Sequence, residues 1–333
     1  MNFPLNLNIY SFNFLLYVSI FLLLNFIFLK IFFKFSISKK LLDIPNKRSS
    51  HIKATPKGAG IVFSLTSIIF IILIFKVNHI LILMPLLIIS FIDDFKPLNS
   101  LSRILVHFFT STLIVLNSNL FEKLTFSNGF IESTIIFVFL VIASTAIINF
   151  FNFSDGIDGI VASSASIYLI FIGLILSPIF LIIGLSLIIF LIFNWSPAKL
   201  FMGDVGSTFI GSIVSIAFLT QNNFLSSFSL LLMISPILMD PFFCVIRRLL
   251  NKQNIFIAHK SHLYQRLHQG GWKHSDISLL FSAATFILCS SFIFLGRPYG
   301  ILAVFLNFFI GIYLEIRHAV PFINSDFQKS SLK

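Results

Sequence analysis

A run of 36 consecutive residues, Ile160–Trp195, contains no charged side chain, and Met1–Leu29 contains none either. A transmembrane helix needs about 20 consecutive apolar residues, whereas an apolar run this long has no place on a soluble surface. Ser177-Pro178 interrupts the longer run with turn-forming residues. We therefore expect two membrane spans joined there by a tight hairpin.

The composition of the whole chain agrees with a membrane protein. Hydrophobic residues make up 57% of the 333 residues and charged residues 11%, against about 25% charged in ordinary soluble domains. Too few polar groups exist to cover a soluble surface. These values exclude a soluble enzyme, a nucleic-acid-binding domain and a disordered chain. The two cysteines, Cys244 and Cys289, fall in apolar runs and predict neither a disulfide framework nor a metal motif.

The predicted fold class is all-α: a polytopic integral membrane protein with about eleven transmembrane helices, ten being the alternative. Residues 1–333 form a single membrane-embedded domain in this interpretation. The predicted spans are 9–33, 58–75, 79–92, 103–117, 133–151, 159–176, 178–195, 206–221, 227–246, 276–295 and 299–316. The second and third are short for a full crossing, so they tilt, thin the bilayer or form a re-entrant pair.

The basic residues predict the orientation of these spans. Lys30 and Lys34 follow the first apolar run instead of preceding it, which is typical of a retained span and not of a cleaved signal peptide. With the N-terminus outside, 20 of the 23 Lys and Arg residues fall on the inner side. The positive-inside rule then places the C-terminus in the cytoplasm. Since orientation explains most of the net charge of +11, no nucleic-acid partner is required.

Five of the twelve acidic residues gather in three short loops on the predicted inner face: Asp93 and Asp94, Asp155 and Asp158, and Asp204. Any one of these loops, taken alone, is explained as the end of a span where the acids are in water. Unpaired acidic side chains beside the membrane, however, cost free energy. The basic residues of these loops are few: Lys96, Arg103 and Lys199. We therefore expect a bound divalent cation, and oxygen ligands favour Mg²⁺ or Mn²⁺ over Zn²⁺.

The same face carries features of phosphate binding. Gly203–Ser207 directly precedes a predicted span, where glycines and free helix N–H groups admit an anion. The first inner loop is basic and contains His51 and Lys57, and the last inner loop contains His259, His262 and Arg266. The positive-inside rule alone explains these basic residues about as well as phosphate binding does.

Two further features of the inner side remain open. A zinc site of His259, His262 and His268 is conceivable, but neighbouring Lys260 and Arg266 would repel a cation, so anion contacts are favoured. Asp240 lies inside a predicted span, about 12 Å from the inner surface. It either fixes the helix geometry or reaches the inner face.

The motifs in chain order resemble those of the polyprenyl-phosphate N-acetylhexosamine-1-phosphate transferases, which include the WecA-like and MraY-like enzymes. They are Thr55-Pro56 with Gly58 and Gly60, Asp93-Asp94, the segment Asn149–Gly159, the segment Phe201–Ser207, and the histidine-containing last loop. The resemblance covers about Leu42 to Lys273, which is most of the chain.

The last loop departs from the WecA-like pattern. His259 stands where that branch has an Asp, and Tyr264-Gln265 replace its second and third His. This version, with Asp43–His51 upstream, is similar to the WbpL-like branch that starts O-antigen-type glycans. The resemblance therefore implies N-acetylglucosamine or a 6-deoxy relative such as N-acetylfucosamine as the sugar.

The resemblance implies that undecaprenyl phosphate and a UDP-N-acetyl sugar give undecaprenyl-diphosphate-sugar and UMP. This would be the first membrane step of O-antigen, lipopolysaccharide or other cell-envelope polysaccharide synthesis, in the bacterial inner membrane with the active site facing the cytoplasm. The lipid bilayer is then an obligatory partner, and a homodimer is compatible with this interpretation. The catalytic loops would be 34–60, 92–103, 149–159, 195–207 and 247–274.

The resemblance also implies roles for single residues. Asp204, Asn152 and Asp155 would hold Mg²⁺, with Mn²⁺ as a substitute. The catalytic acids would be Asp93, Asp94, Asp155 and Asp158, with Asp93 or Asp94 positioning the lipid phosphate. The substrate-binding residues would be Arg103, Asn149, Lys199, Gly203, Ser207, His259, His262, Arg266, Lys57 and His51.

A secondary transporter of an anionic solute is the alternative function. Transporters often have broken helices near the middle of the membrane, and Pro85 and Pro236 interrupt two predicted spans. Against it, the acids lie at span ends and no internal repeat is evident.

Overall fold

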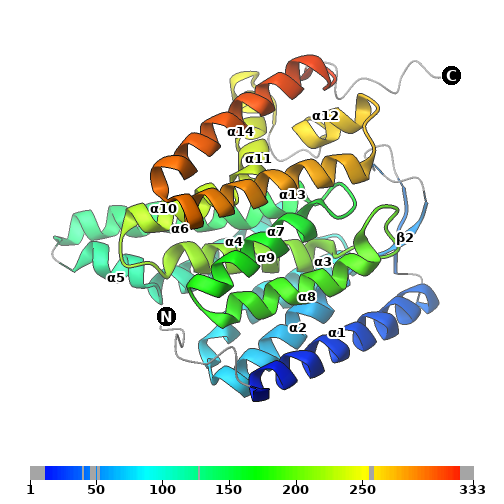
Figure 1. Cartoon of the computed structure of the whole chain (residues 1–333), viewed down its shortest axis with the longest axis horizontal. Coiled ribbons are helices and arrows are strands. Elements are labelled where there is room, and N and C mark those ends of the chain that lie inside the picture. The colour runs from blue at the N-terminus through cyan, green and yellow to red at the C-terminus, as the bar shows by residue number, and fades with distance from the viewer. Residues whose placement is uncertain are drawn as a thin grey trace.

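The helices lie side by side in one bundle, with α1 (Phe12–Ser38) on one side and α14 (Arg297–Arg317) on the other (Figure 1). This computed structural model describes residues 12–39, 41–45, 50, 53–126, 128–254 and 259–322. Within the described residues, each of the eleven predicted apolar segments lies mostly in helix. The other long helices are α2 (Gly60–Phe70), α3 (Met84–Phe95), α4 (Ser100–Leu116), α6 (Phe130–Ser154), α7 (Ile160–Ile175), α8 (Pro178–Asn194), α9 (Gly203–Leu219), α10 (Phe224–Met233), α11 (Ser235–Leu250) and α13 (His274–Ser290).

Short elements complete the described chain. Two π-helical segments extend long helices: η1 (Ile71–Phe75) continues α2, and η3 (Ser291–Leu295) continues α13. A 3₁₀ segment, η2 (Asn78–Leu83), leads into α3. The remaining elements are α5 (Asn119–Thr125), α12 (Leu263–Gln269) and an antiparallel ladder of β1 (Leu42–Asp43) with β2 (Thr55–Pro56).

Several helices have the length and composition of membrane spans. Five described helices are long and apolar enough to cross a membrane, and counting each bent pair as one span raises the number to seven. Four shorter apolar helices, Gly60–Phe75, Ile160–Ile175, Pro178–Asn194 and Gly203–Leu219, lie among them. The chain is thus an all-α, multi-pass membrane protein, as predicted. The count of eleven crossings and the orientation stay predictions.

The exposed side chains of the outer helices fit contact with lipid. Helix α14 exposes a row of large apolar residues: Leu302, Phe305, Leu306, Phe309 and Tyr313. Exposed apolar surface of this extent marks a membrane-facing side. Both cysteines are free and buried, as expected from their apolar runs.

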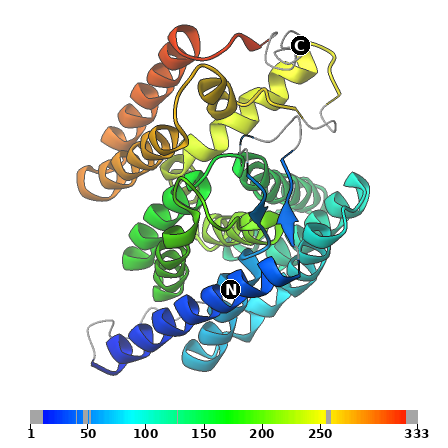
Figure 2. The same ribbon diagram turned by 90° about the vertical axis from the view of Figure 1, so that its right-hand side faces the viewer.

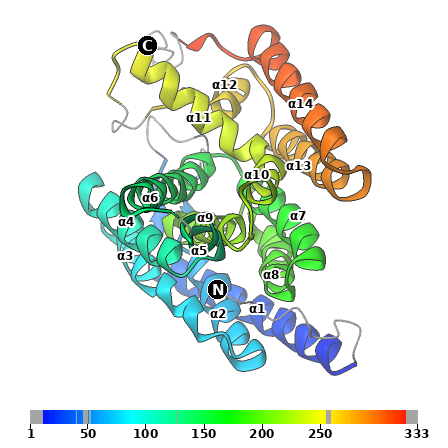
Figure 3. The ribbon, with the colours of Figure 1, turned by 90° about the vertical axis from the view of Figure 1, so that its left-hand side faces the viewer.

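Several of the loops predicted to be catalytic lie at one end of the bundle, on the right in Figure 1 and facing the viewer in Figure 2. We call this the site end. The described parts of the loops that follow α1, α3, α6 and α8 lie there, together with the β1–β2 ladder and α12. Helices α5 and α10 lie at the opposite end, which faces the viewer in Figure 3.

Helix α9 is the centre of the bundle. Every residue from Val205 to Leu219 is buried, and α9 packs against α2, α3 and α6. Small residues allow these close contacts: a Cβ added to Gly60 or Gly206 would collide with the other helix. Interhelical hydrogen bonds add to them, as between Ser215 Oγ and Ser144 Oγ at 2.6 Å. Such small-residue packing holds membrane helices together, because in apolar lipid the hydrophobic effect does not drive helices to associate.

The predicted span 227–246 is a broken helix and not a straight one. Helices α10 and α11 meet at Ile234 with an angle of 89°. Pro236 lies in the first turn of α11, where its missing N–H and fixed φ favour a new helix start. As a result α11 crosses the direction of the other helices (Figure 1).

Candidate functional site

Asp94, near the C-terminus of α3, holds the N-terminus of α9. Its Oδ1 accepts a hydrogen bond from the backbone N–H of Asp204 at 3.0 Å, and its Oδ2 accepts one from Val205 N–H at 3.3 Å. Gly203, just before them, has a φ of +73°, and an added Cβ there would collide with the Asp94 carboxylate. The glycine-rich turn therefore forms around a buried carboxylate, and Asp204 is positioned by it.

Arg103 on α4 connects two of the predicted acids. Its Nη1 lies 3.4 Å from Asp93 Oδ2 and 3.4 Å from Asp204 Oδ2. Asp93 is also bound by Leu98 N–H through Oδ1. The Arg103 side chain remains 36% exposed, so it can contact a further anion while it keeps both carboxylates.

The C-terminal end of α6 supplies two asparagines. Asn152 Nδ2 donates to Ser207 Oγ on α9 at 3.1 Å. Asn149 Oδ1 lies 3.2 Å from Nδ1 of the buried His107, one helical turn after Arg103 on α4. These amides are thereby fixed relative to α9 and α4.

The loop after α6 contains two carboxylates in different environments. Burial raises the pKa of Asp155 well above its usual range, and the nearby charges of Asp204, Asp94 and Asp158 raise it further. No described residue donates a hydrogen bond to the Asp155 carboxylate. Burial also acts to raise the pKa of Asp158, but hydrogen bonding and attraction to His274 (Nδ1–Oδ2 3.2 Å) and a bond from Ala198 N–H together lower it. Asp158 therefore holds the loop in place, whereas the Asp155 carboxylate forms no ion pair with a described residue.

These residues surround two adjoining cavities of about 270 Å³ each. The first, which we call the acidic cavity, is lined by five carboxylates, with Lys57 and His274 as basic neighbours. Its acids are Asp43, Asp94, Asp155, Asp158 and Asp204. The second, which we call the arginine cavity, is lined by Asp93, Arg103, His107, Asn149, His259 and His262, with apolar Ile104, Phe153 and Val245. Asn152, Asp204 and Gln265 line both cavities and form the wall between them.

Asp240 takes the first of the two roles that the sequence left open, since it fixes local helix geometry and lines neither cavity. From α11 its carboxylate accepts hydrogen bonds from Leu263 N–H at 2.7 Å and Tyr264 N–H at 3.1 Å, at the N-terminus of α12. Tyr264 OH in turn donates to Phe153 O at 2.8 Å. Asp240 thus caps α12 and brings His262 and Gln265 to the cavities.

Some predicted substrate-binding residues do not reach the cavities. Arg266 is buried and binds Ser261 O, Val320 O and Glu315, so its guanidinium supports α12 instead of facing either cavity. Lys199 is exposed and lines neither cavity. His51 lies outside the described residues. Lys57 and Gly203 do line the acidic cavity.

The predicted trio of His259, His262 and His268 does not form. His268 Nδ1 lies 2.9 Å from Trp272 O, and its ring packs on His274 with centroids 4.4 Å apart. The contact arises because α12 turns His268 to the side opposite His262, toward α13.

Several cavity residues were not predicted as site residues, among them Asp43, His107, Gln265 and His274. His107 had a usable signal, because it follows Arg103 by four residues and so shares its helix face. His274 offered none, since it comes to Asp158 only through the packing of α13 against the loop after α6.

The oxygen donors in and beside the shared wall fit a hard divalent cation. Asp204 and Asp155 offer carboxylate oxygens, and Asn152 offers an amide oxygen that no described residue binds. Five carboxylates around one cavity repel each other unless a cation neutralises them. All-oxygen ligation of this kind suits Mg²⁺ or Mn²⁺.

Comparison with known proteins gives matches over the helices that carry these residues. Residues 77–222 match the sequence model of glycosyl transferase family 4. A probable undecaprenyl-phosphate N-acetylglucosaminyl 1-phosphate transferase of Bacillus subtilis is 30% identical over 248 residues, covering 69% of each chain. A phospho-N-acetylmuramoyl-pentapeptide-transferase of Fervidobacterium nodosum is 31% identical over 251 residues, covering 69% of this chain and 79% of its own. An undecaprenyl-phosphate alpha-N-acetylglucosaminyl 1-phosphate transferase of Thermotoga maritima is 28% identical over 256 residues, covering 74% and 80%.

Proposed function

Because the chain belongs to glycosyl transferase family 4, within the polyprenyl-phosphate hexosamine-1-phosphate transferase superfamily, we propose that it transfers an N-acetylated sugar 1-phosphate from a UDP-sugar to undecaprenyl phosphate and releases UMP. The sugar is N-acetylglucosamine or a 6-deoxy relative such as N-acetylfucosamine. The product starts a cell-envelope polysaccharide such as O-antigen or lipopolysaccharide, at the cytoplasmic face of the bacterial inner membrane. One observation carries this proposal: two cavities of different chemistry share the wall formed by Asp204 and Asn152.

The two cavities suit the two substrates. The acidic cavity is polar and suits a nucleotide diphosphate that arrives with a divalent cation, with Lys57 as an additional positive charge. The arginine cavity combines Arg103 with Ile104, Phe153 and Val245, which suits a phosphate on an apolar chain. With the two substrates held on either side of Asp204, the sugar phosphate passes directly from one to the other. No covalent intermediate with the protein is required.

Asp204, Asp155 and Asn152 would hold Mg²⁺, which when bound neutralises the diphosphate and the charge that develops on the leaving UMP. The remaining residues position the attacking group. Arg103 binds the lipid phosphate while Asp93 keeps the guanidinium in place. A phosphate monoester has its second pKa near 6 and is mostly dianionic at neutral pH. Positioning by Arg103 and Asp93 therefore matters more than proton removal.

Incubation of the purified protein with undecaprenyl phosphate, Mg²⁺ and a panel of labelled UDP-sugars tests the proposal. We expect a labelled lipid product and an equal amount of UMP with one sugar of the N-acetyl series. Asp204→Asn should lower turnover at least about a hundredfold, in the range of losses seen when a group that stabilises transition-state charge is removed. The matched control is Asp276→Asn, because Asp276 is exposed and lines neither cavity.

The break between α10 and α11 is the observation that favours the transporter alternative. The same preparation, reconstituted in vesicles, distinguishes the two functions. Uptake of label into the vesicle interior without any lipid-linked product would support transport and reject the transferase.

A further inference from the structure

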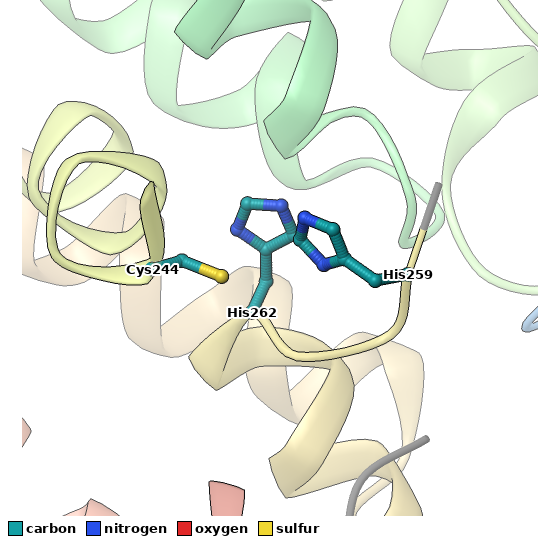
Figure 4. A group of neighbouring side chains, drawn as sticks. All are labelled: Cys244, His259 and His262. Atoms are coloured by element: carbon teal, nitrogen blue, oxygen red, sulfur yellow. The ribbon is translucent and has the colours of Figure 1, made fainter. Parts of the chain in front are cut away.

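A thiol and two imidazoles come together beside the arginine cavity (Figure 4). Cys244 projects from α11, and His259 and His262 come from the segment that leads into α12. One potential ligand atom from each residue lies within 4.8 Å of the others. We propose that these three residues form a binding site for a soft divalent cation, Zn²⁺ being the best fit, and that its occupation inhibits the enzyme.

The chemistry of this cluster differs from that of the shared wall. Thiolate and imidazole ligands select Zn²⁺ over Mg²⁺, whereas carboxylate and amide oxygens do the reverse. Cys244 and His262 are both buried, with 3% and 4% of their surface exposed, so an ion there would be shielded from water. The two sites therefore take different metals without competing.

Asp240 supplies negative charge beside the three ligands. It precedes Cys244 by one helical turn on α11, so the two side chains share a face. Asp240 Oδ1 lies 3.7 Å from His262 Nδ1. Zn²⁺ displaces the thiol proton of Cys244 on binding, and the resulting thiolate and the Asp240 carboxylate balance its charge. Of the nearby cations, Arg247 and Arg266 are already paired with Glu315.

A small local adjustment completes the geometry. Tetrahedral zinc with bonds of about 2.0 to 2.3 Å places its ligand atoms roughly 3.3 to 3.6 Å apart. The rings of His259 and His262 are stacked, with centroids 5.0 Å apart and planes tilted by 28°, whereas a metal must lie in the plane of each ring. His259 therefore turns and gives up its bond from Ser261 N–H, which at 3.3 Å is long. The half-buried position of His259 leaves room for this rotation.

Occupation of this site removes two groups from the arginine cavity, which is the reason to expect inhibition. His259 and His262 both line that cavity, and they cannot contact a substrate phosphate while they bind the ion. This consequence rests on the proposed transferase function. The binding itself does not.

Titration of the full-length protein with Co²⁺, in detergent and free of other metals, tests the binding. We expect the near-ultraviolet charge-transfer absorption of a cobalt–thiolate bond, with one thiolate-bound Co²⁺ per chain, and loss of that band on adding Zn²⁺. Cys244→Ala should abolish the band. Cys244→Ser should abolish it as well, although its side chain has nearly the volume of cysteine. Cys289→Ala is the matched control, because it removes the other buried thiol and should leave the band intact. A band that persists without Cys244, or that never forms, overturns the proposal whether or not the protein is a transferase.

The inhibition is measured separately, at saturating Mg²⁺. Zn²⁺ should inhibit the wild type, and Cys244→Ala should require at least about tenfold more Zn²⁺ for the same inhibition, since loss of a ligand costs no less than loss of a supporting residue. Cys244 lines neither substrate cavity, so activity without Zn²⁺ should be unchanged. Equal sensitivity of the two proteins would show that Zn²⁺ acts elsewhere.

Discussion

Asp94 on α3 accepts the backbone N–H of Asp204 at 3.0 Å, so one acid of the site holds another in place. Replacement Asp94→Ala removes this bond and the one from Val205 and leaves the N-terminus of a buried helix uncapped. Hydrogen bonds to a charged group are worth about 1.5–3 kcal/mol each, and loss of a helix cap about 1 kcal/mol. We expect a loss of about 2 kcal/mol or more in unfolding free energy, seen as a lower Tm in detergent.

Asp93→Ala is the matched control for this variant. Asp93 is equally buried, but it meets α9 only through the Asp204 side chain and accepts no backbone N–H of α9; its other partners are Arg103 and Leu98 N–H. Its Tm should fall less than that of Asp94→Ala, although activity should fall in both. Equal losses of Tm would contradict the capping role of Asp94.

Gly203→Ala should be strongly destabilising. A φ of +73° costs a non-glycine residue about 1–2 kcal/mol, and the added Cβ meets the Asp94 carboxylate as well. The control is Gly311→Ala on α14, where an added Cβ meets nothing within 4 Å. Since alanine favours helix over glycine by about 1 kcal/mol, Gly311→Ala should raise the Tm or leave it unchanged. A Gly203→Ala protein with wild-type Tm would mean that the turn is not built as described.

Glu315 on α14 connects the last helix to the site. It binds Arg247 on α11, with an Nη2–Oε2 distance of 2.7 Å, and Arg266 on α12 at 3.0 Å. Arg247 is 37% exposed and Arg266 only 3% exposed. We therefore expect the contribution of this network to stability to lie between those of an exposed and a buried ion pair. Glu315→Gln should cost about 1–3 kcal/mol and raise KM more than it lowers kcat, since α12 carries His262 and Gln265.

Glu132→Gln tests whether any lost carboxylate on this chain has the same effect. Glu132 is exposed at the opposite end, where it caps the start of α6 through Gly129 N–H. A glutamine there keeps an acceptor oxygen, so KM should be unchanged. A comparable change of KM in both variants would remove the link between Glu315 and α12.

Much of the site could be predicted from the sequence. Asp93, Asp94, Asp155 and Asp204 each follow or precede an apolar run, and the positive-inside pattern puts all of those junctions on one side. The structure brings them to one cavity wall or its immediate support. The physical reason is that span length and charge are local properties of the chain.

The partners of single side chains could not be predicted in the same way. A guanidinium in the last loop binds a phosphate or a distant carboxylate equally well, and only the packing of α14 shows that Arg266 takes Glu315. Likewise Asp94 and Asp93 are adjacent in the sequence and alike in chemistry. Which of them caps α9 depends on how α3 is rotated against α9, a tertiary property that no local pattern records.

The tie between Asp158 and His274 predicts a dependence of stability on pH. In the folded protein the pKa of Asp158 is lowered, because the bonds from His274 and Ala198 N–H outweigh the effect of burial. A lowered folded pKa stabilises the protein fully above the unfolded value of about 3.9, and this contribution is lost as the pH falls through the folded pKa. The difference in Tm between the wild type and Asp158→Asn should therefore be constant from pH 7 to about 5 and shrink below about 4. His274→Ala removes the main stabilising partner of Asp158, so its Tm should depend less on pH over the same range. If the Tm difference between the wild type and Asp158→Asn widened in acid, Asp158 would not be stabilised as an anion.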